Sequence, residues 1–185
     1  MTAQPPFLTD VATLRQRARQ HMEEGAITDS YGANREIVIK LLNEALATEL
    51  LCVLRYRRHH FMAAGLSAKS VAQEFMQHSI EEQAHADQIA SRIVQLRGEP
   101  NFSPDGLSSR SHAEYVECDS LVEMIKENLV AERIAIDSYR DMINYLGDND
   151  TTTRRMLEGI LAMEEEHADD LLTLVEQYVP VDQKT

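Results

Sequence analysis

The sequence predicts an all-α protein, a bundle of four long helices in which one long crossover joins the second helix to the third. Two observations lead to this prediction. Apolar residues recur at three- and four-residue steps over long stretches, which is the helical period, and no stretch shows the alternation of a strand. The seven Gly and five Pro fall mostly in three short segments, which leaves the stretches between them uninterrupted.

Breaks in the apolar pattern divide the chain into four helices, expected over residues 33–64, 68–97, 119–146 and 150–178. Ser67 is a candidate N-cap of the second helix, and Asn149 or Asp150 of the fourth. The sequence GEP, beginning at Gly98, is expected to stop the second helix. Pro180 is expected to close the fourth helix.

The lengths of the connections predict the topology. Short turns join helices one and two, and helices three and four, so each pair is antiparallel. The 21-residue linker over 98–118 is rich in Ser, Pro, Gly and Asn. Extended, it reaches roughly 70 Å, whereas each helix is about 42–48 Å long. It can therefore return the chain along the whole bundle, so that helices two and three run parallel.

The chain outside the four helices is divided as follows. Residues 1–32 are expected to form an N-terminal extension with a candidate short helix over 10–23, residues 33–180 the bundle, and residues 181–185 a tail. The extension contains the basic stretch LRQRARQH, but Glu23 and Glu24 follow closely, which favours a solvated helix face over a nucleic-acid contact.

Composition limits the classes of function. The net charge is −13, the opposite of what phosphate contacts require, and it suits cations instead. Cys52 and Cys118 do not form a disulfide framework and are expected to be buried or half-buried thiols. No apolar run reaches the roughly 18–20 residues of a membrane span. The N-terminus lacks the order of a secretion signal, so the expected location is the cytoplasm.

A Glu-x-x-His pattern occurs twice, as Glu82 with His85 and as Glu164 with His167. Glu82 lies 17 residues after the turn near residue 65, and Glu49 lies about as far before it. Glu164 lies 16 residues after the turn near residue 148, and Glu132 lies 16 before it. In an antiparallel hairpin, such residues face each other at one height. Six residues should therefore meet at mid-bundle: Glu49, Glu82, His85, Glu132, Glu164 and His167.

These side chains predict a dinuclear metal centre. Four carboxylates carry −4 and the two imidazoles are taken as neutral, so burial requires cations, and two divalent irons supply +4. The alternative is that the pairs are solvated surface pairs, because Glu is common in this chain. The equal spacings and the apolar flanks of Glu49 and Glu132 favour the metal centre. Spacing alone leaves open which carboxylates bridge the two metals.

At these six residues the sequence resembles the ferritin superfamily, and within it the bacterioferritin family most closely. The likeness covers about residues 35–178 and includes LNEALATELLCVLRY and HADQIASRIVQLRGEPN. It implies two Fe per subunit, with Glu82 and Glu164 bridging and Glu49 and Glu132 terminal. It also implies that Tyr56 lies beside the irons, where it hydrogen-bonds to the site or supplies an electron.

The resemblance further implies ferroxidase activity, in which O2 or H2O2 oxidises Fe(II), and a hollow homo-oligomeric shell that stores ferric mineral. Haem is doubtful, because Gln83 stands where the family has its haem-binding Met. The longer crossover, the N-terminal extension and the lack of room for a fifth helix favour 12 subunits over 24. Paired cysteines of the bacterioferritin-like 12-subunit proteins are not matched clearly by Cys52 and Cys118.

Two other functions are retained as alternatives. A DNA-protecting, mini-ferritin-like stress protein is one, although DNA binding is not favoured. A rubrerythrin-like di-iron redox enzyme is the other, but two cysteines cannot form an in-chain rubredoxin centre. Among the remaining histidines, His59 and His60 are expected at the surface, and His78 is a weaker candidate for facing the site or the shell interior.

Overall fold

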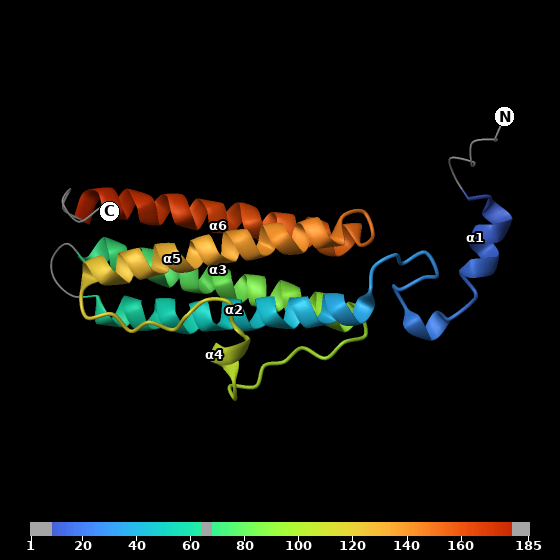
Figure 1. Ribbon diagram of the computed structural model, residues 1–185, viewed down its shortest axis with the longest axis horizontal. Helices are drawn as coiled ribbons and strands as arrows, with labels where there is room; N and C mark the ends of the chain where they lie inside the picture. The colour runs from blue at the N-terminus through green and yellow to red at the C-terminus, as the bar shows by residue number, and fades with distance from the viewer. Residues whose placement is uncertain (1–8, 64–67, 179–185) are drawn as a thin grey trace.

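The computed structural model describes residues 9–63 and 68–178, and these residues form helices and loops without a strand. The chain forms four long helices, and Figure 1 shows that they pack side by side. They are α2 (Arg35–Met62), α3 (Ala68–Gln95), α5 (Leu121–Leu146) and α6 (Thr151–Tyr178). The shorter elements are α1 (Val11–Arg17), a 3-10 turn (Met22–Glu24) and α4 (Leu107–Arg110). The all-α four-helix prediction is confirmed.

The crossover between α3 and α5 returns the chain along the outside of α2, as Figure 1 shows. The expected long connection is therefore confirmed, and it contains the short helix α4, which the Ser- and Gly-rich composition did not predict. None of the described helices combines the length and apolar composition needed to cross a membrane.

Side-chain caps define the starts of the bundle helices. Asn34 accepts a hydrogen bond from the Ile37 amide at 3.1 Å and starts α2. Ser120 and Glu123 form a capping box at the start of α5. Asp150, rather than Asn149, accepts from the Thr153 amide at 2.9 Å and caps α6. The predicted N-cap Ser67, the stop at Pro180 and the tail over 181–185 lie outside the described residues.

The end of α3 differs from the prediction in one detail. The left-handed residue is Arg97, with φ 61°, not Gly98. Gly98 is needed for a different reason, since a Cβ there would lie 2.8 Å from Ile39 Cγ2 on α2. Its lack of a side chain therefore allows close packing between the end of α3 and the start of α2.

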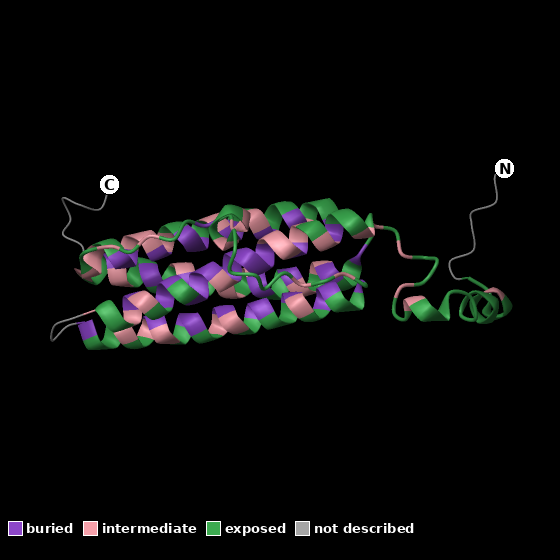
Figure 2. Ribbon diagram, turned by 90° about the horizontal axis from the view of Figure 1, so that it is seen from below, coloured by how far each residue is buried: buried purple, intermediate pink, exposed green. Residues whose placement is uncertain are grey.

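The extension contains a short helix, as predicted, but this helix does not span residues 10–23. Helix α1 ends at Arg17, and His21, with φ 50°, separates it from the 3-10 turn. Helix α1 buries no residue and lies beyond the end of the bundle, so no packing extends it (Figures 1 and 2). The segment that follows does contact the bundle, through a Tyr31 hydroxyl that donates to Asp150 Oδ2 at 2.9 Å. The division at residue 32 stays a prediction.

The bundle core consists of two apolar clusters. Figure 2 shows buried residues along the faces that the long helices turn toward one another. One cluster includes Leu46, Ile89 and Leu157, and the other includes Phe75 and Leu171. In all four long helices, the predicted site residues occur along the chain between members of the two clusters. Apolar packing on both sides therefore fixes the level of the polar site and limits its access to water.

A buried ion pair joins the last turn of α3 to the start of α6. It predicts that the folded state loses stability in acid. Arg92 Nη2 lies 2.9 Å from Asp150 Oδ1, and Thr153 donates to the same carboxylate. Burial alone would raise the pKa of Asp150, but the hydrogen bonds from Thr153 and Tyr31 and the charge of Arg92 hold it below 3.8. Because the pKa of Asp150 is lower in the folded state than in the unfolded state, its ionised carboxylate stabilises the fold at any pH above the unfolded-state pKa. This contribution is lost as the pH falls through the folded-state pKa.

We therefore expect Tm to fall as pH drops below about 4, with part of this fall missing in Asp150→Asn. At neutral pH, Asp150→Ala should lower the free energy of unfolding by about 1 kcal/mol through the lost helix cap and by about 3 kcal/mol through the unpaired Arg92. Thermal unfolding at several pH values measures both effects. Exposed Asp148→Asn is the control. Equal pH profiles for Asp150→Asn and the unsubstituted protein would contradict this account.

Candidate metal centre

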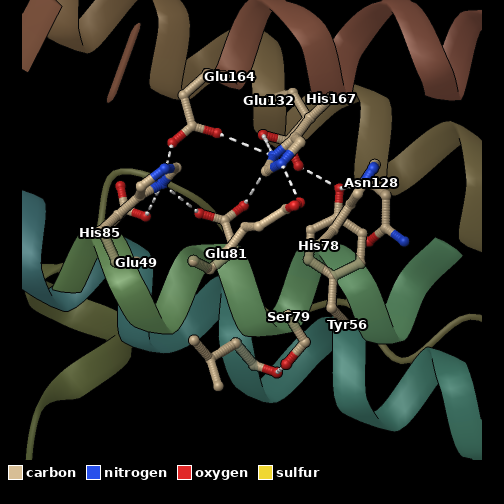
Figure 3. Close-up of polar contacts among 12 residues, drawn as sticks. Glu49, Tyr56, His78, Ser79, Glu81, His85, Asn128, Glu132, Glu164 and His167 are labelled. Carbon is tan, nitrogen blue, oxygen red and sulfur yellow. Dashed lines mark hydrogen bonds and ion pairs between the residues drawn. The ribbon is translucent and has the colours of Figure 1, made fainter. Parts of the chain in front are cut away.

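All six residues predicted for the metal centre meet inside the bundle. The four long helices each contribute: α2 supplies Glu49, α3 supplies Glu82 and His85, α5 supplies Glu132, and α6 supplies Glu164 and His167. None of the six is more than 5% exposed. Figure 3 labels all of them except Glu82, and the labelled side chains point toward a common centre from different helices. The solvated-pair alternative is excluded by this burial.

The site has two halves that share two carboxylates. His85 Nδ1 lies 3.0 Å from Glu164 Oε1 and 3.4 Å from both Glu49 Oε2 and Glu82 Oε2. His167 Nδ1 lies 3.5 Å from Glu164 Oε2, 3.6 Å from Glu82 Oε1 and 4.0 Å from Glu132 Oε2. Glu82 and Glu164 thus present one oxygen to each half. In each half, four candidate ligand atoms lie within 4.8 Å of one another.

Several of these inward-facing atoms have no hydrogen-bond partner among the described residues. They are Glu49 Oε2, Glu82 Oε1, both oxygens of Glu164, and Nδ1 of His85 and His167. Leaving buried polar atoms unpaired is costly, so a site that gathers them needs a ligand. Carboxylate oxygen and imidazole nitrogen are donors for iron and other divalent transition metals. The residues present therefore fit two metal ions, one in each half.

The carboxylates cannot all stay ionised without added positive charge. Burial, followed by the charge of Glu82, raises the pKa of Glu49 to about 8. Burial and the charges of Glu82 and Glu164 raise the pKa of Glu132 well above its usual range. Burial also opposes ionisation of Glu82, but contacts with the two imidazoles keep its pKa below the ordinary value. Protons or cations must therefore neutralise part of the site.

The two histidines act as counter-charges in the protein alone. Burial disfavours their charged forms, but contacts with Glu164 and Glu82 outweigh burial and raise the pKa of His167 to about 11. Contacts with Glu164, Glu49 and Glu82 raise the pKa of His85 further still. The sequence analysis took both imidazoles as neutral, which holds only when metal is bound. Metal binding should therefore release a proton from each histidine.

Two tyrosines hold the outer carboxylates in a crossed arrangement. The Tyr56 hydroxyl donates to Glu132 Oε1, and the Tyr139 hydroxyl donates to Glu49 Oε1. Tyr56 was expected beside the site, whereas Tyr139 was missed. A signal for it exists in the sequence, because Tyr56 follows Glu49 by seven residues and Tyr139 follows Glu132 by seven. The repeat between the two hairpins therefore extends from the metal-ligating types to the tyrosines.

A second layer of polar residues orients His167. Its Nε2 lies 3.0 Å from Glu81 Oε2, and Gln77 donates to the other oxygen of Glu81 at 2.6 Å. The His78 ring stacks on the His167 ring with centroids 4.1 Å apart, and its Nδ1 lies 3.2 Å from the Tyr56 hydroxyl oxygen. Of the two positions considered for His78, beside the site or at the shell interior, these contacts favour the first. A ligating imidazole held through its other nitrogen is common in metal sites.

The surface position predicted for His59 is wrong. His59 is fully buried, with Nδ1 3.0 Å from Asn128 Oδ1 and Nε2 3.0 Å from the Val116 carbonyl oxygen. Arg55, also buried, donates to the Glu114 carbonyl at 2.8 Å. Both residues hold the end of the crossover against α2, and the sequence pattern could not show where the crossover lies. His60 is half-buried, so it is only partly exposed as expected.

The two thiols match the expectation from composition. Cys52 is buried, Cys118 is half-buried, and both are free. Burial raises the pKa of the Cys52 thiol well above its usual value. The amide of Gln83, at the position where the resemblance places haem, donates to Asp87 Oδ1 at 3.0 Å.

Known proteins are similar to this chain in sequence. A bacterioferritin of Rhodobacter capsulatus is 32% identical over 144 residues, which cover 76% of this chain and 84% of the relative. A bacterioferritin of Mycobacterium tuberculosis is 32% identical over 141 residues, covering 75% and 84%. Both relatives therefore match through most of their own length.

Two solved structures resemble the fold. A dodecameric thioferritin, the bacterioferritin-related protein of Bacteroides fragilis, has a TM-score of 0.73 at 30% identity, covering 80% of this chain and 94% of that one. The R. capsulatus bacterioferritin, described with a metal-free dinuclear site and haem iron, has a TM-score of 0.69 at 28% identity, covering 77% and 86%. The family model of the ferritin-like domain matches residues 39–178. This chain therefore belongs to the ferritin family of ferritin-like domains.

Proposed function

We propose that this protein is an iron-storage and iron-detoxification protein with ferroxidase activity. The observation that carries the proposal is the pair of four-donor sets that share Glu82 and Glu164 and contain unpaired buried atoms. The bacterioferritin relatives support the same function. Fe(II) and O2 or H2O2 are the proposed substrates, and the cytoplasm is the proposed location.

The proposed roles follow the two halves of the site. One half (Glu49, Glu82, His85, Glu164) and the other (Glu82, Glu132, Glu164, His167) would each hold one Fe(II). Glu82 and Glu164 would be the shared ligands, because each presents one oxygen to each half. Two Fe(II) give up two electrons, which with two protons reduce O2 to H2O2, or H2O2 to two waters. Hard oxygen donors suit both oxidation states of iron.

The surrounding residues position the ligands and exclude water. Tyr56 and Tyr139 donate to the outer carboxylates, so each leaves the other oxygen of its partner directed at the metal position. Glu81 fixes the ring of His167 through Nε2. The apolar clusters on both sides keep the site dry, which strengthens its electrostatic interactions. Haem is not part of the proposal, because Gln83 occupies that position.

Tyr139→Phe tests the tyrosine that the sequence analysis missed. The change leaves Glu49 Oε1 without its donor, so the carboxylate is less well held for the metal. We expect the Fe(II) concentration at half-maximal oxidation rate to rise by about tenfold, the usual cost of removing such a supporting contact. Tyr145→Phe, on the same helix and 47% exposed, is the control and should have no effect. Equal kinetics for the two variants would remove Tyr139 from the proposal.

Iron loading tests the function as a whole. Aerobic addition of Fe(II) in many-fold excess over subunits should yield a soluble, iron-rich protein with the absorbance of a ferric mineral. Catalytic turnover of peroxide without mineral would instead favour the rubrerythrin-like redox enzyme. Light scattering after size-exclusion chromatography tests the shell, since 12 and 24 subunits differ twofold in mass. The dodecameric relative supports a 12-subunit shell for this chain.

A further inference from the structure

A third group of potential ligands lies next to the dinuclear centre, between α3 and α6. It consists of Glu74 and His78 on α3 and Asp170 on α6. His78 Nε2 lies 3.5 Å from Glu74 Oε1 and 3.8 Å from Asp170 Oδ2. Two donors on one ion, each about 2.1 Å from it, are at most ~4.2 Å apart, so both separations fit a shared cation.

The hydrogen bonds of His78 leave its Nε2 facing the two carboxylates without a partner. The Tyr56 hydroxyl uses its single hydrogen to donate to Glu132, so at the 3.2 Å contact the His78 Nδ1–H donates to the tyrosine oxygen. A neutral imidazole has only one N–H, which here is on Nδ1, so Nε2 carries a lone pair and can only accept. That atom is buried and has no hydrogen-bond partner among the described residues.

A lone pair that faces two carboxylates is unfavourable unless something positive lies between them. Ionised Glu74 and Asp170 can only accept, so neither can satisfy His78 Nε2. A divalent cation would bind the lone pairs of all three groups at once. Mixed imidazole and carboxylate ligands suit Fe(II) or Zn(II). The competing solution is a proton shared within the cluster.

The position of the cluster suggests what the cation does. The His78 side chain is 1% exposed, whereas Glu74 is 39% and Asp170 49% exposed, so the cluster connects solvent to the interior. His78 also stacks on His167 of the dinuclear centre, as Figure 3 shows. An ion held here would be separated only by the His78 ring from His167, a ligand in the half of the dinuclear centre that also contains Glu132.

We propose that Glu74, His78 and Asp170 form a third divalent-cation site, where Fe(II) is held in transit between solvent and the dinuclear centre. The transit role rests on the proposed ferroxidase function, whereas the cation site itself does not. The site differs from the dinuclear centre in having a solvent-exposed side, so its ion should exchange more readily.

Zn(II) binding to the full-length assembled protein tests the site without redox chemistry. Crystals soaked in Zn(II) should show anomalous density between His78 Nε2, Glu74 and Asp170, and titration of Glu74→Gln/Asp170→Asn should find one bound Zn(II) fewer per subunit. Asp169→Asn removes a neighbouring exposed charge and should leave the count unchanged. Absence of density there at saturating Zn(II), or an unchanged count in the double variant, would overturn the site in favour of the shared proton.

Stopped-flow Fe(II) oxidation tests the transit role. The double variant should oxidise Fe(II) about tenfold more slowly than the unsubstituted protein from the first addition onward, because iron bound for the dinuclear centre passes through the weakened site, whereas Asp169→Asn should keep the normal rate. A normal rate in the double variant together with a lost third Zn(II) would overturn the transit role and leave the cation site standing. Failure of the unsubstituted protein to oxidise Fe(II) would instead count against the proposed function.

Discussion

Replacement of Glu82 and His85 together by Ala is expected to abolish rapid Fe(II) oxidation, with a loss of about 100-fold or more in the initial rate. Loss of supporting contacts alone costs about 10–100-fold, and this variant loses two ligands, one of them shared by both metals. Stopped-flow absorbance after aerobic mixing with two Fe(II) per subunit measures the effect.

The matched control for that experiment is Asp87→Ala with Gln88→Ala. Both residues are exposed on the same helix and lie outside the metal centre. Circular dichroism and light scattering would show that each double variant keeps its helices and its assembly. Fast oxidation by a correctly assembled Glu82→Ala/His85→Ala protein would show that the chemistry takes place elsewhere.

Metal loading should strongly stabilise the fold, because ions offset the repulsion among the buried carboxylates. Zn(II) at about 100 times its Kd contributes about 2.7 kcal/mol per site. For a chain of 185 residues, two such sites raise Tm by about 10–20 °C. Differential scanning calorimetry with and without Zn(II), after removal of metals by a chelator, measures this shift.

The Glu82→Ala/His85→Ala variant provides the control for the calorimetry, since it keeps the same surface but lacks the intact centre. Its Tm should rise far less on Zn(II) addition. A comparable rise in both proteins would mean that Zn(II) stabilises the fold through surface sites, and that the central carboxylates are not the groups that bind it.

The sequence predicted the bundle and its metal centre because both depend on regular spacing. Helical periodicity placed the four long helices, and counting from the two turns placed Glu49 opposite Glu82 and Glu132 opposite Glu164. Residues whose environment depends on the crossover were not predictable in this way. His59 was expected at the surface, but it is buried and contacts the Val116 carbonyl of the crossover, and nothing in the local pattern shows where that segment lies.

Other differences have local physical reasons. The helix expected over residues 10–23 is short because its sequence has helical propensity but no apolar surface to pack against. Gly98 follows the end of α3, as expected, and its amide donates to the Ile93 carbonyl at 2.9 Å, but its lack of a side chain is required by the close packing against Ile39. Tyr139 was not predicted because tyrosine is not a typical iron ligand in such carboxylate sites, although it follows Glu132 by the same seven residues by which Tyr56 follows Glu49.

The most direct test of the central claim is a crystal structure of the protein loaded with iron, with anomalous data collected at the iron absorption edge. The account predicts two peaks about 3.5–4 Å apart. Glu82 and Glu164 should lie between them, His85 should bind one and His167 the other. A map in which these side chains point away from a common centre, or in which no iron lies among them, would contradict the account.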